Sequence, residues 1–128
     1  MSTIRDFTEL DIWKLARITC QKVHGLKANI TVAKDYALYD QMNRSSGSVM
    51  DNIAEGFERN GNKEFIHFLS IAKASCGELR SQIFRCLDRQ YIDKPDFEIL
   101  VNETEILGKR IGSFMHYLKN SPLKGTKF

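Results

Sequence analysis

Residues 63–88 form the longest amphipathic pattern in the chain, and this pattern constrains the fold most. Apolar side chains recur there every three or four residues, and no proline interrupts them. This spacing puts them on one face of a helix, which other elements must cover. The stripe comprises Phe65, Phe68, Leu69, Ala72, Cys76, Leu79, Ile83, Cys86 and Leu87.

Three further segments have a helical period, and turn-forming residues separate them. The predicted helices run roughly over residues 8–24, 35–59, 62–89 and 94–120, with a loop at 26–34. Long helices joined by short connections pack most economically as an up-and-down antiparallel bundle. The sequence therefore predicts an all-α, four-helix bundle, with residues 1–128 as one domain. A coiled-coil dimer of longer hairpins is the structural alternative.

Residues typical of helix ends flank these segments. Thr8 with Asp11 resembles a capping box, and Gly25 follows the first helix. The residues expected to cap the later helices are Asp35, Asn62 and Asp93.

Composition narrows the class of protein. The chain has 128 residues and a formal net charge of +3, which permits a nucleic-acid partner without requiring one. Its three cysteines lie in apolar patterns and form no C-x-x-C pair, as expected of reduced thiols in a cytoplasmic protein. No apolar run is long enough to span a membrane, so we expect no membrane partner.

Residues 41–59 combine an apolar stripe with a second, polar face. At about 100° per residue, six polar side chains share that face, and we expect it to meet something outside the bundle. They are Arg44, Ser48, Asp51, Asn52, Glu55 and Arg59. Gly47 and Gly56 each weaken a helix by about 1 kcal/mol relative to alanine, which predicts close backbone approach at both positions.

Small residues form a ridge on another face of the helix predicted at 62–89. They recur at spacings of four, three and four, and they are Ser70, Ala74, Gly77 and Ser81. Such a ridge lets a second helix approach closely, either within the bundle or from a neighbouring subunit. Together with the polar face, it predicts a homo-oligomer.

Motifs for catalysis or cofactor binding are missing from the sequence. Glu64 and His67 have the spacing of one half of a di-iron site, but the second such pair is absent and His67 lies off the apolar stripe. Neither a glycine-rich phosphate loop nor a G-x-S-x-G elbow occurs. We therefore expect no enzyme, no metal and no cofactor.

Basic residues are the remaining candidates for a function. Solvated surface charge is the simplest explanation of each, but symmetric repetition in an oligomer would multiply their field. The candidate nucleic-acid or partner surface consists of Arg44, Arg59, Lys63, Lys73, Arg80, Arg85 and Arg89.

A composite motif links the chain to a known family. Asn52-Ile53-Ala54-Glu55-Gly56 is followed by Lys63-Glu64-Phe65, while Leu10-Asp11-Ile12-Trp13-Lys14 precedes it and Gln90-Tyr91-Ile92 follows. Over residues 10–118 the chain resembles the bacterial four-helix-bundle family that includes proteins encoded in intervening sequences of 23S ribosomal RNA genes. The accessory variability determinant of diversity-generating retroelements is similar.

The resemblance implies a homo-oligomer, typically a homopentamer, without known catalytic activity. In the retroelement protein it implies a basic surface that binds RNA or DNA and a reverse transcriptase. The matching polar positions are Arg44, Asn52, Glu55, Arg59, Lys63 and Glu64. An ion-pair network at the turn between helices, with Glu55 paired to Arg59, or a subunit contact is favoured over direct ligand binding.

The sequence thus predicts a non-enzymatic, oligomeric helical bundle that binds nucleic acid or a nucleic-acid-processing partner. The alternative is a scaffold that binds another polypeptide and no nucleic acid.

Overall fold

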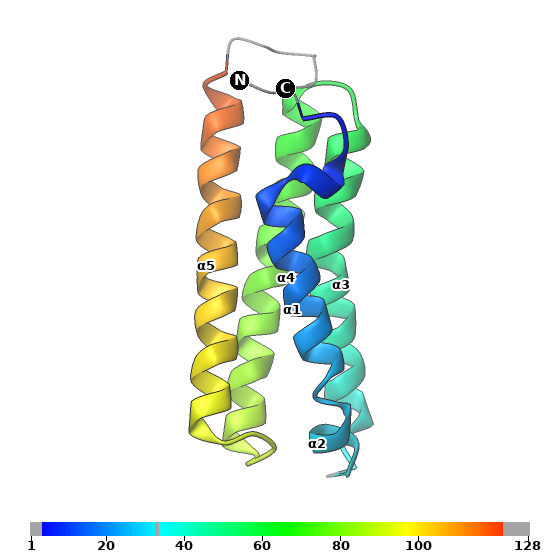
Figure 1. Cartoon of the computed structure of the whole chain (residues 1–128), viewed down its shortest axis with the longest axis vertical. Helices are drawn as coiled ribbons and strands as arrows, with labels where there is room; N and C mark the ends of the chain where they lie inside the picture. The colour runs from blue at the N-terminus through cyan, green and yellow to red at the C-terminus, as the bar shows by residue number, and fades with distance from the viewer. Residues whose placement is uncertain (1–3, 33, 122–128) are drawn as a thin grey trace.

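Four long helices form an up-and-down bundle in the computed structural model, which describes residues 4–32 and 34–121 (Figure 1). They are α1 (Asp11–His24), α3 (Tyr36–Glu58), α4 (Asn62–Asp88) and α5 (Lys94–Lys119). A 3₁₀ turn, η1 (Phe7–Glu9), precedes α1, and the short helix α2 (Lys27–Val32) precedes α3. The described residues include no strand, and the predicted all-α antiparallel four-helix bundle is confirmed.

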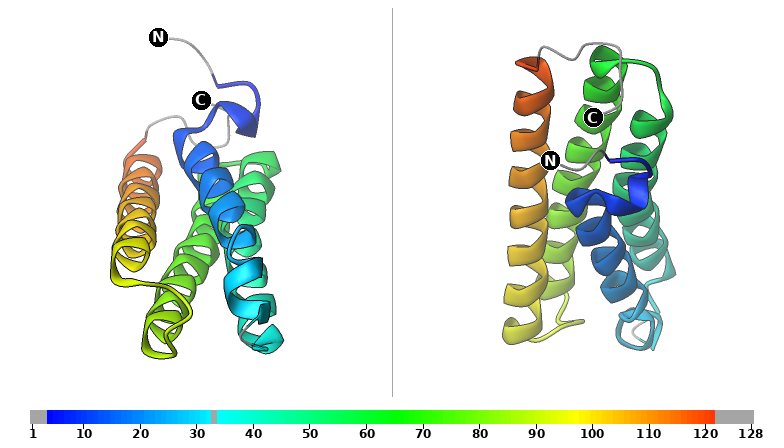
Figure 2. Two further views of the ribbon diagram at one scale, coloured as in Figure 1. Left: turned by 60° about the horizontal axis from the view of Figure 1, so that its bottom comes forward. Right: turned by 45° about the horizontal axis from the view of Figure 1, so that its top comes forward.

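Successive long helices run in opposite directions, so the first and last described residues lie at the same end of the molecule (Figures 1 and 2). Helix α4 packs along both α3 and α5, while the shorter α1 lies mainly against α3. This arrangement leaves one long side of α4 on the surface of the bundle.

The core has two clusters, one near each end of the bundle. The cluster towards the termini includes Trp13, Ile53, Phe65 and Ile111, and the other includes Val23, Met42, Ile83 and Leu100. Both draw on α1, α3, α4 and α5, so the helical stripes read from the sequence meet in the interior.

Two of the expected helix caps are confirmed. The Asp35 carboxylate accepts a hydrogen bond from Leu38 N at the start of α3. Likewise, the Asp93 carboxylate accepts one from Asp96 N at the start of α5, whose first turn contains Pro95. Each carboxylate satisfies a backbone N–H that has no partner within the helix.

Two other expected caps are wrong. The capping box pairs Asp6 with Glu9 around η1, so Thr8 and Asp11 do not form it. At the start of α4, Gly61 is the capping position, with φ of 97°. Asn62 lies inside the helix and buried, and its side chain donates to the Leu118 carbonyl oxygen at 3.2 Å.

The loop predicted at 26–34 is also partly wrong, because Lys27–Val32 is helical. Leu26 and Ile30 are both buried in the second core cluster, and their i, i+4 spacing requires a helical turn to bring them there. Tertiary burial outweighs the weak helix propensity of Asn29 and its neighbours.

The cysteine thiols are free in the described structure. Cys76 and Cys86 are buried, and burial raises the pKa of each thiol to about 11. Cys20 is half-buried, and desolvation raises its pKa as well. Because the thiolate is the reactive form, all three act as packing side chains at neutral pH.

Candidate nucleic-acid and partner interface

The small-residue ridge of α4 lies on the outside of the bundle. All four of its members, Ser70, Ala74, Gly77 and Ser81, are exposed. A Cβ atom placed on Gly77 would meet nothing within 4 Å. Among the described residues, no helix therefore packs on the ridge at Gly77, which excludes the alternative that the ridge is used within the bundle.

The predicted basic residues separate into groups on either side of this ridge. Lys73 and Arg80 lie on the α5 side, where they line a hollow of about 300 Å³ together with Lys109 of α5. We call this the α4–α5 hollow; Gly77 and Gly108 contribute to its wall. Within residues 4–32 and 34–121, neither Lys73 nor Arg80 forms an ion pair.

Contacts nearby fix two of these cations. The Arg80 guanidinium lies over the Phe84 ring, 5.5 Å from its centroid, and Lys109 pairs with Glu105 at 3.5 Å. Sequence reasoning gave Lys109 no place on the candidate surface, because the register between two helices is a tertiary property.

The cations on the α3 side of the ridge have partners. Arg85 donates to Gln41 Oε1 at 3.1 Å, and Arg44 pairs with Asp40 at 2.9 Å. Arg89 pairs with Asp35 at 2.7 Å. The predicted basic surface is thus two surfaces, and its α3 side is largely occupied by intramolecular contacts.

Asp35 is the centre of a small polar cluster at the end of α4. The Tyr91 hydroxyl donates to Asp35 Oδ2 at 2.7 Å, and Arg89 approaches the same oxygen. The hydrogen bond from Tyr91, with that from Leu38 N and the charge of Arg89, lowers the pKa of Asp35 below its ordinary value. These contacts tie the start of α3 to the turn between α4 and α5.

The polar face predicted on residues 41–59 is not one free surface. Ser48 Oγ lies 2.8 Å from Ser75 Oγ of α4, and the Asn52 side chain donates to Ser48 O at 2.8 Å. Ser45, which the sequence did not single out, donates to Glu78 Oε1 at 2.9 Å. Part of the face is therefore a seam between α3 and α4, while Asp51 remains exposed.

The expected ion pair at the turn after α3 is confirmed. Arg59 Nε lies 3.2 Å from Glu55, and the guanidinium lies over the Phe68 ring at 4.9 Å. Lys63 and Glu64 are exposed and form no ion pair with a described residue, so the wider predicted network does not form within one chain.

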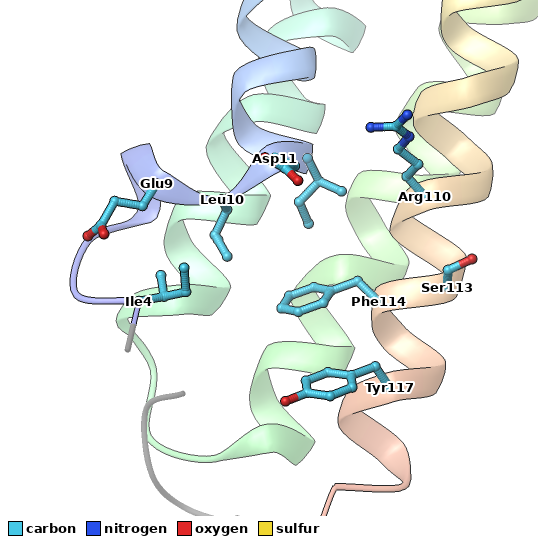
Figure 3. A pocket seen from close by; sticks show the side chains of 9 residues that line it. Ile4, Glu9, Leu10, Asp11, Arg110, Ser113, Phe114 and Tyr117 are labelled. Atoms are coloured by element: carbon cyan, nitrogen blue, oxygen red, sulfur yellow. The ribbon is translucent and has the colours of Figure 1, made fainter. Parts of the chain in front are cut away.

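A second hollow, at the end of the bundle where α1 begins and α5 ends, involves residues that the sequence analysis missed. It lies between the start of α1 and the last turns of α5, has a volume of about 520 Å³, and is mainly apolar (Figure 3). Phe114 and Tyr117 project into it, with their rings stacked at 5.9 Å, and Arg110 lies on the same wall. The available signal was Tyr117, a large aromatic residue off the buried stripe of its helix.

The described residues contain neither a metal-binding cluster nor a membrane-spanning helix. Among the described residues, no three His, Cys, Asp or Glu side chains are placed to hold a metal ion. His67 is exposed and contacts the edge of Phe68. No described helix has the length and apolar character of a membrane span.

Comparison with known proteins identifies the family. Residues 8–113 match the pattern of the family described as 23S rRNA-intervening sequence protein. The chain belongs to this family. A crystal structure of a protein of unknown function from the S23 ribosomal protein family of Bacteroides thetaiotaomicron is similar, with a TM-score of 0.77 at 20% identity, over 81% of this chain and 97% of that chain. It supports the fold of this family member. No curated protein sequence matches the chain.

Proposed function

We propose that this 23S rRNA-intervening sequence protein family member is a non-enzymatic bundle that assembles with copies of itself and binds nucleic acid. The observation that carries the proposal is the α4–α5 hollow, where Lys73 and Arg80 lie beside Lys109. Phosphate oxygens are the natural partners of such a group, because Lys and Arg neutralise the backbone and release its counterions.

The ion pairing around this hollow supports this assignment, because Glu105, which also lines it, pairs with Lys109. Lys73 and Arg80 have no ion-pair partner among the described residues, whereas Arg44 and Arg89 each have one. A phosphate at the α4–α5 hollow therefore displaces fewer intramolecular contacts than one bound on the α3 side.

Gel-shift titration with a structured RNA at several salt concentrations tests the proposal. The double variant Lys73→Ala/Arg80→Ala is expected to bind more weakly, and the slope of log affinity against log salt should fall by about two, roughly 0.9 per lost phosphate contact. The control Lys14→Ala/Lys94→Ala removes the same charge from exposed positions on other parts of the bundle and should leave the slope unchanged.

Two results would count against it. Wild-type protein that retains no RNA or DNA at low ionic strength removes nucleic-acid binding as the function. If both double variants lose the same amount of RNA affinity, binding depends on net charge and not on the α4–α5 hollow.

Self-assembly is the second part of the proposal. The exposed ridge of Ser70, Ala74, Gly77 and Ser81 offers a helix of another copy a close approach, and the flanking cations then repeat around the assembly. From the family resemblance we propose five copies, with a reverse transcriptase as a class of protein partner.

A protein scaffold is the alternative function, and one observation favours it. Ile99 and Ile106 on α5 are 53% and 39% exposed, one heptad apart, as on a helix that meets another polypeptide. Affinity purification after nuclease treatment distinguishes the two functions, because the scaffold alone retains its partner with no nucleic acid present.

A further inference from the structure

Exposed isoleucines line the long side of the bundle between α1 and α5 (Figure 1). Lys22 of α1 pairs with Glu103 of α5 at 2.7 Å, which joins the two helices across this side. Ile18 precedes Lys22 by four residues, while Ile99 and Ile106 lie four residues before and three after the carboxylate partner. Residues at these spacings share a helix face, so the three isoleucines border the ion pair. We call this surface the α1–α5 face.

A mainly apolar hollow on the outside of α4 has room for such side chains. This α4 hollow has a volume of about 440 Å³ and is lined by Ser70, Ile71, Ala74, Ser75 and Glu78. Most of these side chains are small, so two copies of the ridge placed against each other would bury little apolar surface. A partner of the ridge must therefore bring large apolar side chains of its own, as the α1–α5 face does.

The register between α4 and α5 puts Ile106 level with this hollow along the bundle. Cys76 Sγ donates to the Thr104 carbonyl oxygen at 3.2 Å, and the two helices are antiparallel. Ile106 follows Thr104 by two residues. It is therefore at the height of Ala74, which precedes Cys76 by two residues. A copy generated by rotation about an axis parallel to the helices keeps these heights, so Ile106 of one copy reaches Ala74 of the next.

Charges at the two surfaces are complementary at matching heights. By the same register Glu103 is at the height of Gly77, so Lys22, which pairs with Glu103, is close to the height of Glu78. Glu78 is exposed and forms no ion pair with a described residue. Because a lysine ammonium has three N–H donors, Lys22 can contact Glu103 of its own chain and Glu78 of a neighbour together.

We propose that the α1–α5 face of one copy packs head-to-tail onto α4 of the next, an inference that rests on the proposed self-assembly. Ile106 enters the α4 hollow beside Ala74. Ile99, one heptad away, packs over Ser81, which lies one heptad from Ala74. Each copy then uses two different surfaces, and repetition of such a contact closes a ring when the rotation permits it.

Light scattering on mixed variants tests this contact. Ile106→Arg disrupts the α1–α5 face and leaves α4 intact, whereas Ala74→Arg does the reverse. Each variant alone is expected to be a folded monomer of 14.7 kDa, with its helicity checked by circular dichroism. An equal mixture should form a dimer of twice that mass, because the α1–α5 face of Ala74→Arg meets the intact α4 of Ile106→Arg.

Tyr36→Arg is the matched control, since Tyr36 is a large exposed residue of α3 outside both surfaces. It should keep the wild-type mass. Oxidative cross-linking gives a second measurement: Ala74→Cys mixed with Ile106→Cys should yield a reducible dimer, and neither variant should do so alone.

Three outcomes would overturn the inference. If Ile106→Arg keeps the wild-type mass, self-assembly does not use the α1–α5 face, and the isoleucines are left for a different protein. If the mixed variants stay monomeric and their cysteine counterparts do not cross-link, the copies do not meet head-to-tail. A monomeric wild type removes self-assembly and this contact together, while the gel shift still reports nucleic-acid binding separately.

Discussion

Gly56 shows how one residue can decide the approach of two helices. A Cβ atom at this position would lie 2.8 Å from Phe65 Cδ1 and 2.9 Å from Phe68 Cβ, both on α4. These distances are shorter than van der Waals contact, so α3 and α4 meet here only because the side chain is a hydrogen atom. At Gly47, by contrast, a Cβ atom would meet nothing within 4 Å, so close approach was predicted correctly at one glycine and wrongly at the other.

Replacement of each glycine by alanine should change the free energy of unfolding in opposite directions. Gly56→Ala is expected to lower the free energy of unfolding by about 1–3 kcal/mol, because the buried Phe65 ring and the Phe68 Cβ atom must move. Gly47→Ala should raise it by up to about 1 kcal/mol through helix propensity. Urea denaturation measures the free energy of unfolding of both variants. A Gly56→Ala protein as stable as the wild type would contradict the packing argument.

Asp35 makes stability depend on pH at the acid end. Its pKa is lowered, chiefly by the hydrogen bond from Tyr91, relative to an ordinary value of 3.8. The stabilisation is therefore present above the unfolded pKa and is lost as pH falls through the lower, folded pKa. Tyr91→Phe should raise the pKa of Asp35 towards its ordinary value, measured by NMR titration of the side-chain carboxyl carbon.

A neighbouring tyrosine provides the control for this titration. Tyr36 is 66% exposed and adjacent to Asp35 in sequence, so Tyr36→Phe should leave the pKa of Asp35 where it is. An equal rise in both variants would show that the hydrogen bond from Tyr91 is not the cause.

At the scale of the element, local signals placed the long helices well and their first residues less well. Asp35 and Asp93 cap α3 and α5 as expected, because a carboxylate next to the first turn needs no distant partner. Asn62 does not cap α4, since its amide is recruited by the Leu118 carbonyl oxygen at the far end of the chain. Local chemistry cannot reveal that competing acceptor.

Removal of the α5 cap should have a moderate and measurable cost. Asp93→Ala is expected to lower the free energy of unfolding by about 1 kcal/mol, because Asp96 N loses its acceptor. Asn102→Ala, at an exposed position within the same helix, is the control and should change stability little. Thermal denaturation followed by circular dichroism compares them, and equal midpoints would argue against the cap.

At the scale of the whole molecule, the exposed ridge of α4 is the feature that a single bundle does not use. A smooth outward face with cations along its edge is suited to a second copy, which would bury the small residues and leave Lys73 and Arg80 at the rim. The two parts of the proposed function are therefore compatible on one helix.

Self-assembly can be tested without disturbing the core. Light scattering should give a mass well above the 14.7 kDa of one chain. Ala74→Arg, at an exposed ridge position, should reduce the mass to that of a monomer while helicity is retained. Ala37→Arg, at an exposed alanine of α3, should not do so. A wild-type mass near that of one chain would rule out the assembly.

The sequence alone determined the four long helices, the faces they bury and the family, because helical period and short motifs are local properties of the chain. Tertiary structure decided the rest. It made Lys27–Val32 helical by burying Leu26 and Ile30, and it turned the ridge of α4 outward. It also placed Lys73 and Arg80 on the α5 side of α4 and Arg44 and Arg85 on its α3 side. Each of these depends on the rotation and register of one helix against another, which are set by packing across the bundle and not by any segment on its own.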